Sequence, residues 1–294
     1  MDKVLVIIVT YNAHGWIRQC LNSIDMERYD AFVVDNASSD DTLQILQAEY
    51  PKATVRAMDK NLGFGQANNI GLRYALDNGY DYVFLLNQDA WLLPDTIERL
   101  IAAQKQNPEY WVLSPLQMNT EQGGAEKHFE HFCLQDQVDL CSGKLEPITF
   151  VNAALWLISR KCVEFVGGFD PLFPHYGEDN DYARRVHYWG GKIGVDTATM
   201  AYHEHPIVKK VMTIEQEEYR QKLVLMGMWK DMNTSAFLGG ISMVKLCVRK
   251  MLKCLFLCRF NDMLMYVKAW VETTKQRQKI IVHRELSANP TAFL

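Results

Sequence analysis

The sequence predicts an α/β fold with a mostly parallel, Rossmann-like central sheet flanked by helices and followed by a C-terminal helical extension. Residues 4–9 form a continuous run of Val, Leu and Ile, which is typical of a strand buried on both faces of a parallel sheet. Residues 15–24 follow with their apolar side chains on one helical face. This alternation recurs along the chain and indicates right-handed βαβ units.

The remaining elements are predicted in the same way. Strand patterns occur at residues 31–34, 54–57 and 82–86, and they alternate with helical patterns that end near residues 49, 77 and 106. Further strand patterns occur at 150–158, 192–195 and 199–202, with a helix at 179–189. Residues 118–147 are less regular, and the chain is predicted to be helical from about residue 214 onward.

The composition excludes several classes of protein. The chain has 294 residues, a formal net charge of −4 and 48% hydrophobic residues, which argues against a dedicated nucleic-acid binder. The N-terminus lacks the apolar core of a signal peptide, and no stretch reaches about 18 uninterrupted apolar residues. The seven cysteines form no CxxC pair, so we expect reduced thiols rather than a zinc site. We therefore expect a cytoplasmic protein without a membrane span.

Polar residues follow directly after three of the predicted strands. They are Thr10, Tyr11 and Asn12, then Asp35 and Asn36, and then Asn87 and Asp89. Because ligands bind at the carboxyl ends of strands in parallel sheets, we expect these side chains to converge on one edge. A carboxylate such as that of Asp35 can accept a hydrogen bond from a base N–H or a ribose hydroxyl there.

Asn87 and Asp89 close the fourth predicted strand and suggest a cation site. A hard cation such as Mg²⁺ or Mn²⁺ prefers one or two carboxylates together with phosphate oxygens and water. The alternative is an ordinary turn, where Asn and Asp are common. Residues 61–69 carry two glycines and several amides at a helix start, which favours an anion or is only a glycine-rich connection.

Glu178, Asp179 and Asp181 place three carboxylates at the start of a predicted helix. The helix dipole stabilises such anions, and one of them can serve as a general base toward a hydroxyl group. Since Asp179 and Asp181 point in different directions, we expect one to face a substrate and the other to bond Arg184 or Arg185. The alternative is an ordinary acidic first turn.

In their order and spacing these segments resemble the inverting glycosyltransferases of family 2, which have the GT-A fold, and above all their rhamnosyltransferase-like branch. The matching segments cover about residues 3–205 and are 9–12, 34–38, 61–64 with 68–71, 86–89, 168–170, 178–181 with Arg184, and His203. The resemblance implies a catalytic domain at residues 1–212 and a helical region at 213–294. Within the catalytic domain, the nucleotide-sugar half would span about 1–117 and the acceptor half about 118–212.

The resemblance also implies roles for individual residues. The donor-binding residues would be Thr10, Tyr11, Asn12, Asp35, Asn36, Asn61, Gly63, Phe64, Asn68, Asn87 and Asp89. Asp89 would be the main ligand of Mg²⁺ or Mn²⁺, with His203 as a second ligand and His205 as the alternative to it. Asn87 replaces the first acid of the family's DxD motif, as is usual in this branch. Asp179 would be the catalytic base, facing Asp89 across a single cleft.

The implied activity is transfer of a sugar, with inversion, from a nucleotide-sugar donor to a hydroxyl of a glycan or lipid-linked acceptor, in surface polysaccharide assembly. The expected donor is dTDP-rhamnose or a UDP-hexose. One alternative is a non-catalytic protein on the same scaffold that binds a nucleotide sugar or a glycan; the presence of Asp89 and of the acids at 178–181 argues against it. A nucleotidyltransferase would normally carry a glycine-rich basic loop near its N-terminus, which residues 9–12 lack.

The C-terminal region carries an unusual charge pattern. No acidic residue occurs between Met232 and Asn261, whereas Lys245, Arg249 and Lys253 recur every four residues and so share a helix face. A basic amphipathic helix is typical of peripheral contact with a membrane surface, here the cytoplasmic face of the inner membrane. The alternative, which the sequence leaves equally open, is a helix packed on the catalytic domain with its cationic side chains pointing outward.

Overall fold

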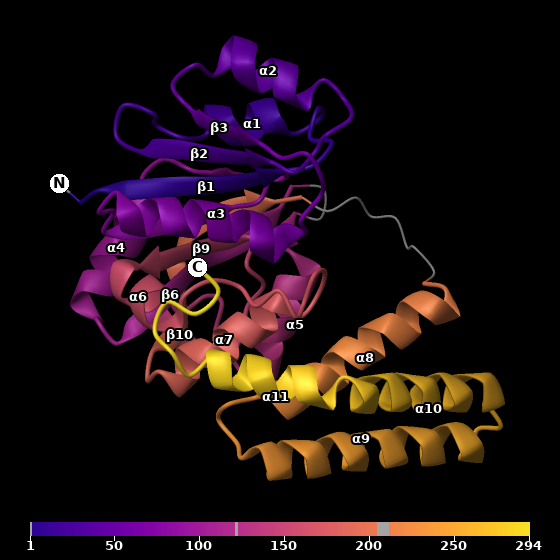
Figure 1. Ribbon diagram of the computed structural model, residues 1–294. Helices are drawn as coiled ribbons and strands as arrows, with labels where there is room; N and C mark the ends of the chain where they lie inside the picture. Colours follow the sequence, from indigo (N-terminus) through magenta and orange to yellow (C-terminus); the bar gives the residue numbers. More distant parts are fainter. Residues whose placement is uncertain (1, 121–122, 205–211) are drawn as a thin grey trace.

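The computed structural model describes residues 2–120, 123–204 and 212–294, and it consists of an α/β unit from which C-terminal helices extend (Figure 1). The alternation predicted for the first part of the chain is confirmed. Strands and helices follow one another as β1 (Val4–Thr10), α1 (Ile17–Asn22), β2 (Asp30–Asp35), α2 (Thr42–Glu49), β3 (Thr54–Ala57), α3 (Phe64–Asp77) and β4 (Tyr82–Leu86). Each apolar run identified in the sequence therefore forms a strand.

The strands form one sheet, in which the main order is β3-β2-β1-β4-β9-β6-β10-β5. The later strands on this path are β5 (Ala90–Leu92), β6 (Tyr110–Asn119), β9 (Leu155–Ser159) and β10 (Lys192–His203). On this path β9 runs antiparallel to β4 and β6, and β5 runs antiparallel to β10, whereas the other strands of the path run in one direction. The sheet is thus mostly parallel, as predicted, and the carboxyl ends of β1, β2 and β4 lie at one edge.

The second half of the unit differs from the prediction in detail. The strand predicted at 150–158 begins only at Leu155, and the two segments predicted at 192–202 form one strand whose register against β6 shifts between Asp196 and Met200. Residues 118–147 are more ordered than expected. They contain the end of β6, β7 (Gly124–Ala125), α5 (Lys127–Gln135) and β8 (Leu145–Ile148). Helix α6 (Arg160–Val166) was not predicted, whereas α4 (Thr96–Gln106) and α7 (Glu178–Tyr188) were.

Alternate residues of β1 enter two different cores. Leu5 and Ile7 pack with residues of α3, α6 and α7 on one face of the sheet. Val6 and Ile8 pack with residues of α1, α2 and α4 on the other face. Burial of both faces explains why this strand reads as a continuous apolar run.

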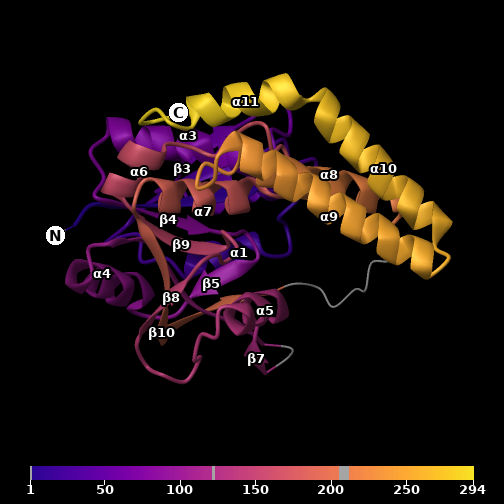
Figure 2. The same cartoon turned by 90° about the horizontal axis from the view of Figure 1, so that it is seen from below.

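The C-terminal region is helical, as predicted. It consists of α8 (Ile214–Lys230), α9 (Ala236–Phe256), α10 (Phe260–Lys275) and α11 (Arg277–Leu286). Helices α8, α9 and α10 pack on one another, and Figure 2 shows α9 and α10 lying side by side away from the sheet. None of the helices in the described ranges is both long enough and apolar enough to span a bilayer. The division of the chain at residue 212 stays a prediction.

The last residues return to the α/β unit. The backbone N–H of Gly168 donates to the carbonyl of Ala292, and the Asn69 side chain donates to the carbonyl of Phe293. Gly167 has a φ of +79°, and a Cβ there would lie 2.1 Å from the Ala292 carbonyl oxygen, so only glycine permits this approach. The end of the C-terminal region is therefore attached to the α/β unit.

Candidate active site

Asp35 lies buried at the end of β2 and is held by three hydrogen bonds. Its Oδ1 accepts from Thr10 Oγ1 at 2.9 Å and from Ser38 Oγ at 2.6 Å, and its Oδ2 accepts from the Ser38 N–H at 3.1 Å. Thr10 ends the neighbouring strand β1, so the convergence predicted for these two residues is confirmed. The carboxylate is thereby fixed in orientation at the edge of the sheet.

Tyr11 and Asn12 continue this edge. Asn12 has a φ of 51°; its N–H donates to Ser38 Oγ at 2.9 Å, and its Oδ1 accepts from the Ser39 N–H at 2.8 Å. The Tyr11 N–H donates to Gln88 Oε1 at 2.7 Å, which joins the ends of β1 and β4. Because the Tyr11 side chain is 48% exposed, its ring is available for stacking on a planar ligand. Gln88 was not among the predicted site residues, although it lies between Asn87 and Asp89.

Asn36 and Asn61 shape the loop before α3. Asn36 Nδ2 donates to Asn61 Oδ1 at 2.9 Å, and Asn36 Oδ1 accepts from the Leu62 N–H at 2.7 Å. The adjacent Gly63 has a φ of +81°, and a Cβ there would lie 2.1 Å from the carbonyl oxygen of Pro174. The glycine is therefore required for the loop to approach the segment that precedes α7.

Phe64 and Asn68 have partners within the protein. The Phe64 ring packs edge-on against Phe169, with 5.8 Å between the ring centroids. Asn68 is buried, and its Nδ2 donates to the Phe64 carbonyl at 3.0 Å. These contacts order the start of α3. Contact of either residue with the nucleotide-sugar donor stays a prediction.

Asp89 and His203 lie together where β4 ends and β5 pairs with β10. His203 is opposite Ala90 in the antiparallel pairing, and its Nε2 lies 3.6 Å from Asp89 Oδ1 and 3.4 Å from Asn87 Nδ2. The three predicted residues are thus brought together. His205, the alternative ligand, lies outside the described residues.

Gln117 sets the orientation of the His203 ring. Its Oε1 lies 3.2 Å from His203 Nδ1, and its Nε2 donates to Ser114 Oγ at 3.2 Å. Since the Gln117 oxygen can only accept, Nδ1 donates to it, and Nε2 is the ring nitrogen that faces Asp89. A hydrogen bond that holds the second ring nitrogen in this way is typical of histidines that bind metals. The sequence offered no sign of Gln117, because β6 was not predicted.

The donor set at this point suits a hard cation that shares its coordination with a phosphate. Asp89 supplies a carboxylate that is 21% exposed, and His203 supplies an imidazole nitrogen. Among the described residues no group of three or more His, Cys, Asp or Glu converges into a complete metal site. The remaining ligands would therefore have to come from a diphosphate and water, as is common for Mg²⁺.

Asp179 stands in the first turn of α7, next to the loop that contacts Asn87. Its carboxylate accepts hydrogen bonds from the N–H groups of Asn180 and Ala153, while the Asn87 N–H donates to the carbonyl of Ala154. Burial raises the pKa of Asp179 to about 6. The dipeptide 153–154 thus contacts both Asp179 and Asn87. A pKa of about 6 leaves Asp179 mostly ionised at pH 7.

The other two acids of this turn differ from Asp179. Burial and the neighbouring Asp179 charge raise the pKa of Glu178 to about 8, and its Oε2 has no hydrogen-bond partner among the described residues. Glu178 is therefore mostly neutral at pH 7. Asp181 Oδ2 accepts from Arg185 Nε at 2.9 Å, which confirms the predicted pairing with one of the two arginines.

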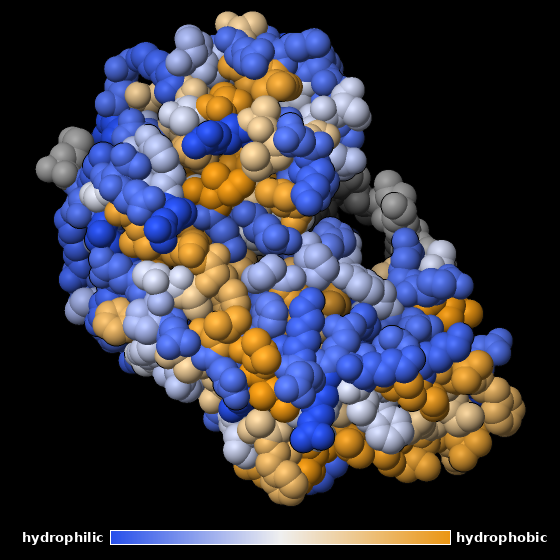
Figure 3. Space-filling view, viewed as in Figure 1, coloured by the Kyte–Doolittle hydropathy of each residue, from blue (hydrophilic) through white to orange (hydrophobic). Residues whose placement is uncertain are grey.

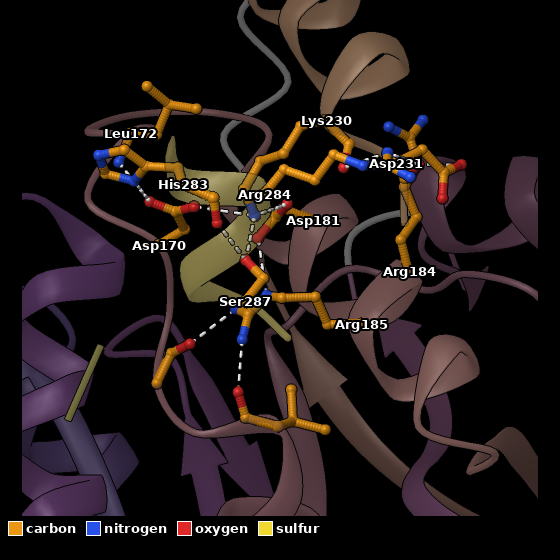
Figure 4. A network of polar contacts seen from close by, with 12 residues as sticks. Asp170, Leu172, Asp181, Arg184, Arg185, Lys230, Asp231, His283, Arg284 and Ser287 are labelled. Carbon is orange, nitrogen blue, oxygen red and sulfur yellow. Dashed lines mark hydrogen bonds and ion pairs between the residues drawn. The ribbon is translucent and has the colours of Figure 1, made fainter. Parts of the chain in front are cut away.

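A buried polar network ties α7 to the C-terminal helices (Figure 4). Lys230 Nζ lies 2.6 Å from Asp181 Oδ1, 2.8 Å from Asp170 Oδ2 and 2.9 Å from Ser287 Oγ. His283 Nδ1 lies 2.6 Å from Asp170 Oδ1. Lys230 ends α8 and His283 belongs to α11, so side chains of the C-terminal region hold the acids beside the first turn of α7. Neither side chain was singled out from the sequence, because its partners are far away along the chain.

Residues 5–164, more than half of the chain, match the model of glycosyl transferase family 2. The chain belongs to glycosyl transferase family 2. Among curated relatives, this glycosyltransferase is 24% identical over 217 residues to the low-salt glycan biosynthesis hexosyltransferase Agl10 of Haloferax volcanii, covering 70% of this chain and 69% of the relative. It is 25% identical over 239 residues to an N-acetylglucosaminyl-diphospho-decaprenol L-rhamnosyltransferase of Mycobacterium tuberculosis, covering 69% of this chain and 76% of the relative.

Solved structures agree in fold. S. aureus TarS 1–349 in complex with UDP-GlcNAc has a TM-score of 0.60 at 16% identity, covering 97% of this chain and 90% of that one. The mannosyltransferase PcManGT of Pyrobaculum calidifontis, in complex with GDP-Man and Mn²⁺, has a TM-score of 0.59 at 15% identity, covering 97% and 86%. The fold is therefore GT-A, and the protein is an enzyme of glycan or polysaccharide biosynthesis.

Proposed function

We propose that this enzyme transfers a sugar from a nucleotide sugar to a hydroxyl group of a glycan or lipid-linked acceptor, with inversion at the anomeric carbon, in surface polysaccharide assembly. The observation that carries the proposal is that the three acids at the start of α7 differ in their ion pairs and in their pKa values. Asp181 is neutralised by Arg185 and Lys230, and Glu178 is buried with a raised pKa. Asp179 alone combines partial exposure with a pKa of about 6.

Asp179 is the base in this mechanism. It accepts the proton of the acceptor hydroxyl, while the oxygen attacks the anomeric carbon from the face opposite the diphosphate. A pKa of about 6 leaves the carboxylate ionised at pH 7 and still basic enough to share the proton as the bond forms. A single displacement of this kind inverts the configuration. General-base assistance of this type contributes typically 10²- to 10⁴-fold.

Asp89 and His203 would hold Mg²⁺ or Mn²⁺, as their carboxylate and imidazole nitrogen suit either ion. When bound, the cation would neutralise the charge that develops on the departing diphosphate. At the same edge, Asp35 would accept a hydrogen bond from the nucleoside, and the exposed Tyr11 ring would stack on its base. The Mn²⁺ complex of PcManGT supports the use of a divalent ion.

dTDP-rhamnose is the first expected donor, and UDP-hexoses come next. Two of the relatives carry rhamnosyltransferase names, among them the dTDP-rhamnosyl transferase RfbF of Shigella flexneri, which is 22% identical over 198 residues. The UDP-GlcNAc complex of TarS supports the second choice. The decaprenol-linked substrate in the name of the M. tuberculosis relative supports a lipid-linked acceptor.

We place the reaction at the cytoplasmic face of the membrane, with the enzyme as a peripheral protein. Lys245, Arg249 and Lys253 are exposed on α9, and the apolar side chains of Leu252 and Phe256 are exposed beside them. Because α9 packs on α8 and α10, its outer side remains available for an anionic surface.

Thermal unfolding with a panel of nucleotide sugars tests the donor site directly. A donor that binds raises the melting temperature by mass action, and the rise should depend on Mn²⁺ or Mg²⁺. The Asp89→Asn variant should lose the metal-dependent part of the rise. Asp77→Asn, which changes an exposed acid of α3, is the matched control. Absence of stabilisation by every nucleotide sugar would contradict the proposal.

A further inference from the structure

A groove of about 600 Å³ lies among the C-terminal helices, outside the site described above. Its apolar walls include Trp229 of α8, Phe237, Ile241 and Val244 of α9, and Trp270 of α10. The volume is in the range of pockets that take small organic ligands. The proposed transfer reaction assigns no role to this groove.

Two glycines near the start of α9 leave space for the groove. A Cβ at Gly239 would lie 2.9 Å from the carbonyl oxygen of Met228, and one at Gly240 would lie 3.3 Å from Trp229 Nε1. The start of α9 can therefore approach the end of α8 closely, while Gly240 adds no side chain to the space in front of Trp229. Trp229 and Trp270 also pack against the buried cluster of α8, α9 and α10, which makes two walls of the groove rigid.

The charge around the groove has one sign. Lys245 and Arg277 are the charged residues among those that line it, and neither side chain pairs with an acid in the described part of the chain. Residues 233–260 contain no Asp or Glu. An apolar ligand without charge would leave both cations unused, and a free nucleotide sugar would meet apolar walls. An amphiphile with an anionic head satisfies both features.

We infer that this groove binds the single hydrocarbon chain of a lipid phosphate, with Lys245 and Arg277 on its phosphate. The inference rests on the lipid-linked acceptor of the proposed function, and it assigns the lipid end of that acceptor to the C-terminal helices. Trp229 directly precedes Lys230, which pairs with Asp181 on the helix that carries Asp179. The groove is thus built on the same helix, α8, that anchors the catalytic turn.

Tryptophan fluorescence tests this inference without an acceptor or a turnover assay. The probe is farnesyl phosphate below its micellar concentration, added to the full-length protein. We expect a saturable change in emission, which should shrink in Trp270→Phe. Farnesol and inorganic phosphate should each bind at least about tenfold more weakly, because each lacks one of the two interactions.

Two matched valine variants separate the groove from the rest of α9. Val244→Asp places a charge within the groove and should abolish binding of farnesyl phosphate, whereas Val248→Asp alters an exposed valine of the same helix outside the lining and should leave it unchanged. Equal melting temperatures for the two variants show that both are folded. The double variant Lys245→Gln and Arg277→Gln should weaken binding about tenfold or more.

Three outcomes would overturn the inference. They are no saturable change with farnesyl phosphate, equal effects of the two valine variants, and equally tight binding of dihexanoyl phosphatidylglycerol, which would indicate a two-chain bilayer lipid instead. Each can occur while nucleotide sugars still stabilise the protein, so failure of the groove is distinguishable from failure of the glycosyltransferase proposal.

Discussion

The α/β unit and the C-terminal helices use apolar side chains in opposite ways. In the α/β unit these side chains are internal: Ile7 is 0% exposed and Leu85 is 1% exposed. In the C-terminal helices several lie at the surface, and Phe237, Phe256 and Phe260 are 75%, 88% and 58% exposed. Figure 3 shows hydrophobic surface along the lower edge of the molecule, where α9 and α10 lie in Figure 1.

The buried apolar side chains of the α/β unit stabilise the fold, whereas the exposed ones of the C-terminal helices are available for recognition. The hydrophobic residues of the α/β unit are accounted for by two cores on either face of the sheet. Those of α9 and α10 exceed what the small cluster among these helices buries. Contiguous exposed apolar surface, here flanked by cations, is typical of a membrane or ligand contact. In the proposed function, the first region supplies the chemistry, and the second holds the enzyme and its acceptor at a lipid surface.

The largest expected effect is on catalysis, in the α/β unit. Asp179→Asn should lower turnover by about 10²- to 10⁴-fold or more, because the amide cannot accept the proton. Stabilisation by the donor should remain nearly intact, since Asp179 acts on the acceptor. Steady-state kinetics and thermal unfolding measure the two effects. Near-normal turnover would exclude Asp179 as the base.

The connection between the two regions provides the next test. Lys230→Met removes the cation shared by Asp170 and Asp181 and leaves two buried carboxylates with less compensation. We expect a loss of about 3–5 kcal/mol in the free energy of unfolding, measured by chemical denaturation. Lys268→Met, at an exposed position of α10, is the control and should change stability by less than about 0.5 kcal/mol. Equal effects would show that the network does not couple the regions.

The proposed contact of α9 with a membrane can be tested without altering the active site. Changing Lys245, Arg249 and Lys253 to Gln should weaken binding to anionic vesicles by about 1 kcal/mol per residue, or roughly 100-fold in all. Vesicle flotation measures this, with Lys52, Lys60 and Lys192 changed to Gln as a control in the α/β unit. Equal partitioning of wild type and the α9 variant would refute the surface role.

The last test concerns the pH dependence of stability. The pKa of Glu178 is raised to about 8 in the folded state, so the folded protein holds this proton more tightly than the unfolded chain does. Its contribution to stability is complete below the unfolded pKa of about 4.3 and is lost by about 1.4 kcal/mol per pH unit as the pH rises toward 8. Glu178→Gln should flatten this decline between pH 5 and 8, as followed by urea denaturation. Glu130→Gln, an exposed change in α5, should not flatten it.

The sequence predicted the first half of the fold because β1, β2 and β4 contain short, continuous apolar runs. β6 was missed because Ser114, Pro115 and Gln117 interrupt its pattern, although all three are buried in the strand. The residues after β1, β2 and β4 could be assigned to one edge by topology alone. Lys230 and His283 could not be assigned, since Lys230 pairs with Asp181 across 49 residues and His283 with Asp170 across 113.

The pH profile of turnover, measured for wild type and Asp179→Asn in parallel, tests the central claim most directly. The base must be ionised, so wild-type turnover should fall about tenfold per pH unit below pH 6 and level off above it. The variant should be slow at every pH and lack this limb. An acidic limb near pH 6 that persists in Asp179→Asn would show that another group takes the proton, and the assignment of the base would be wrong.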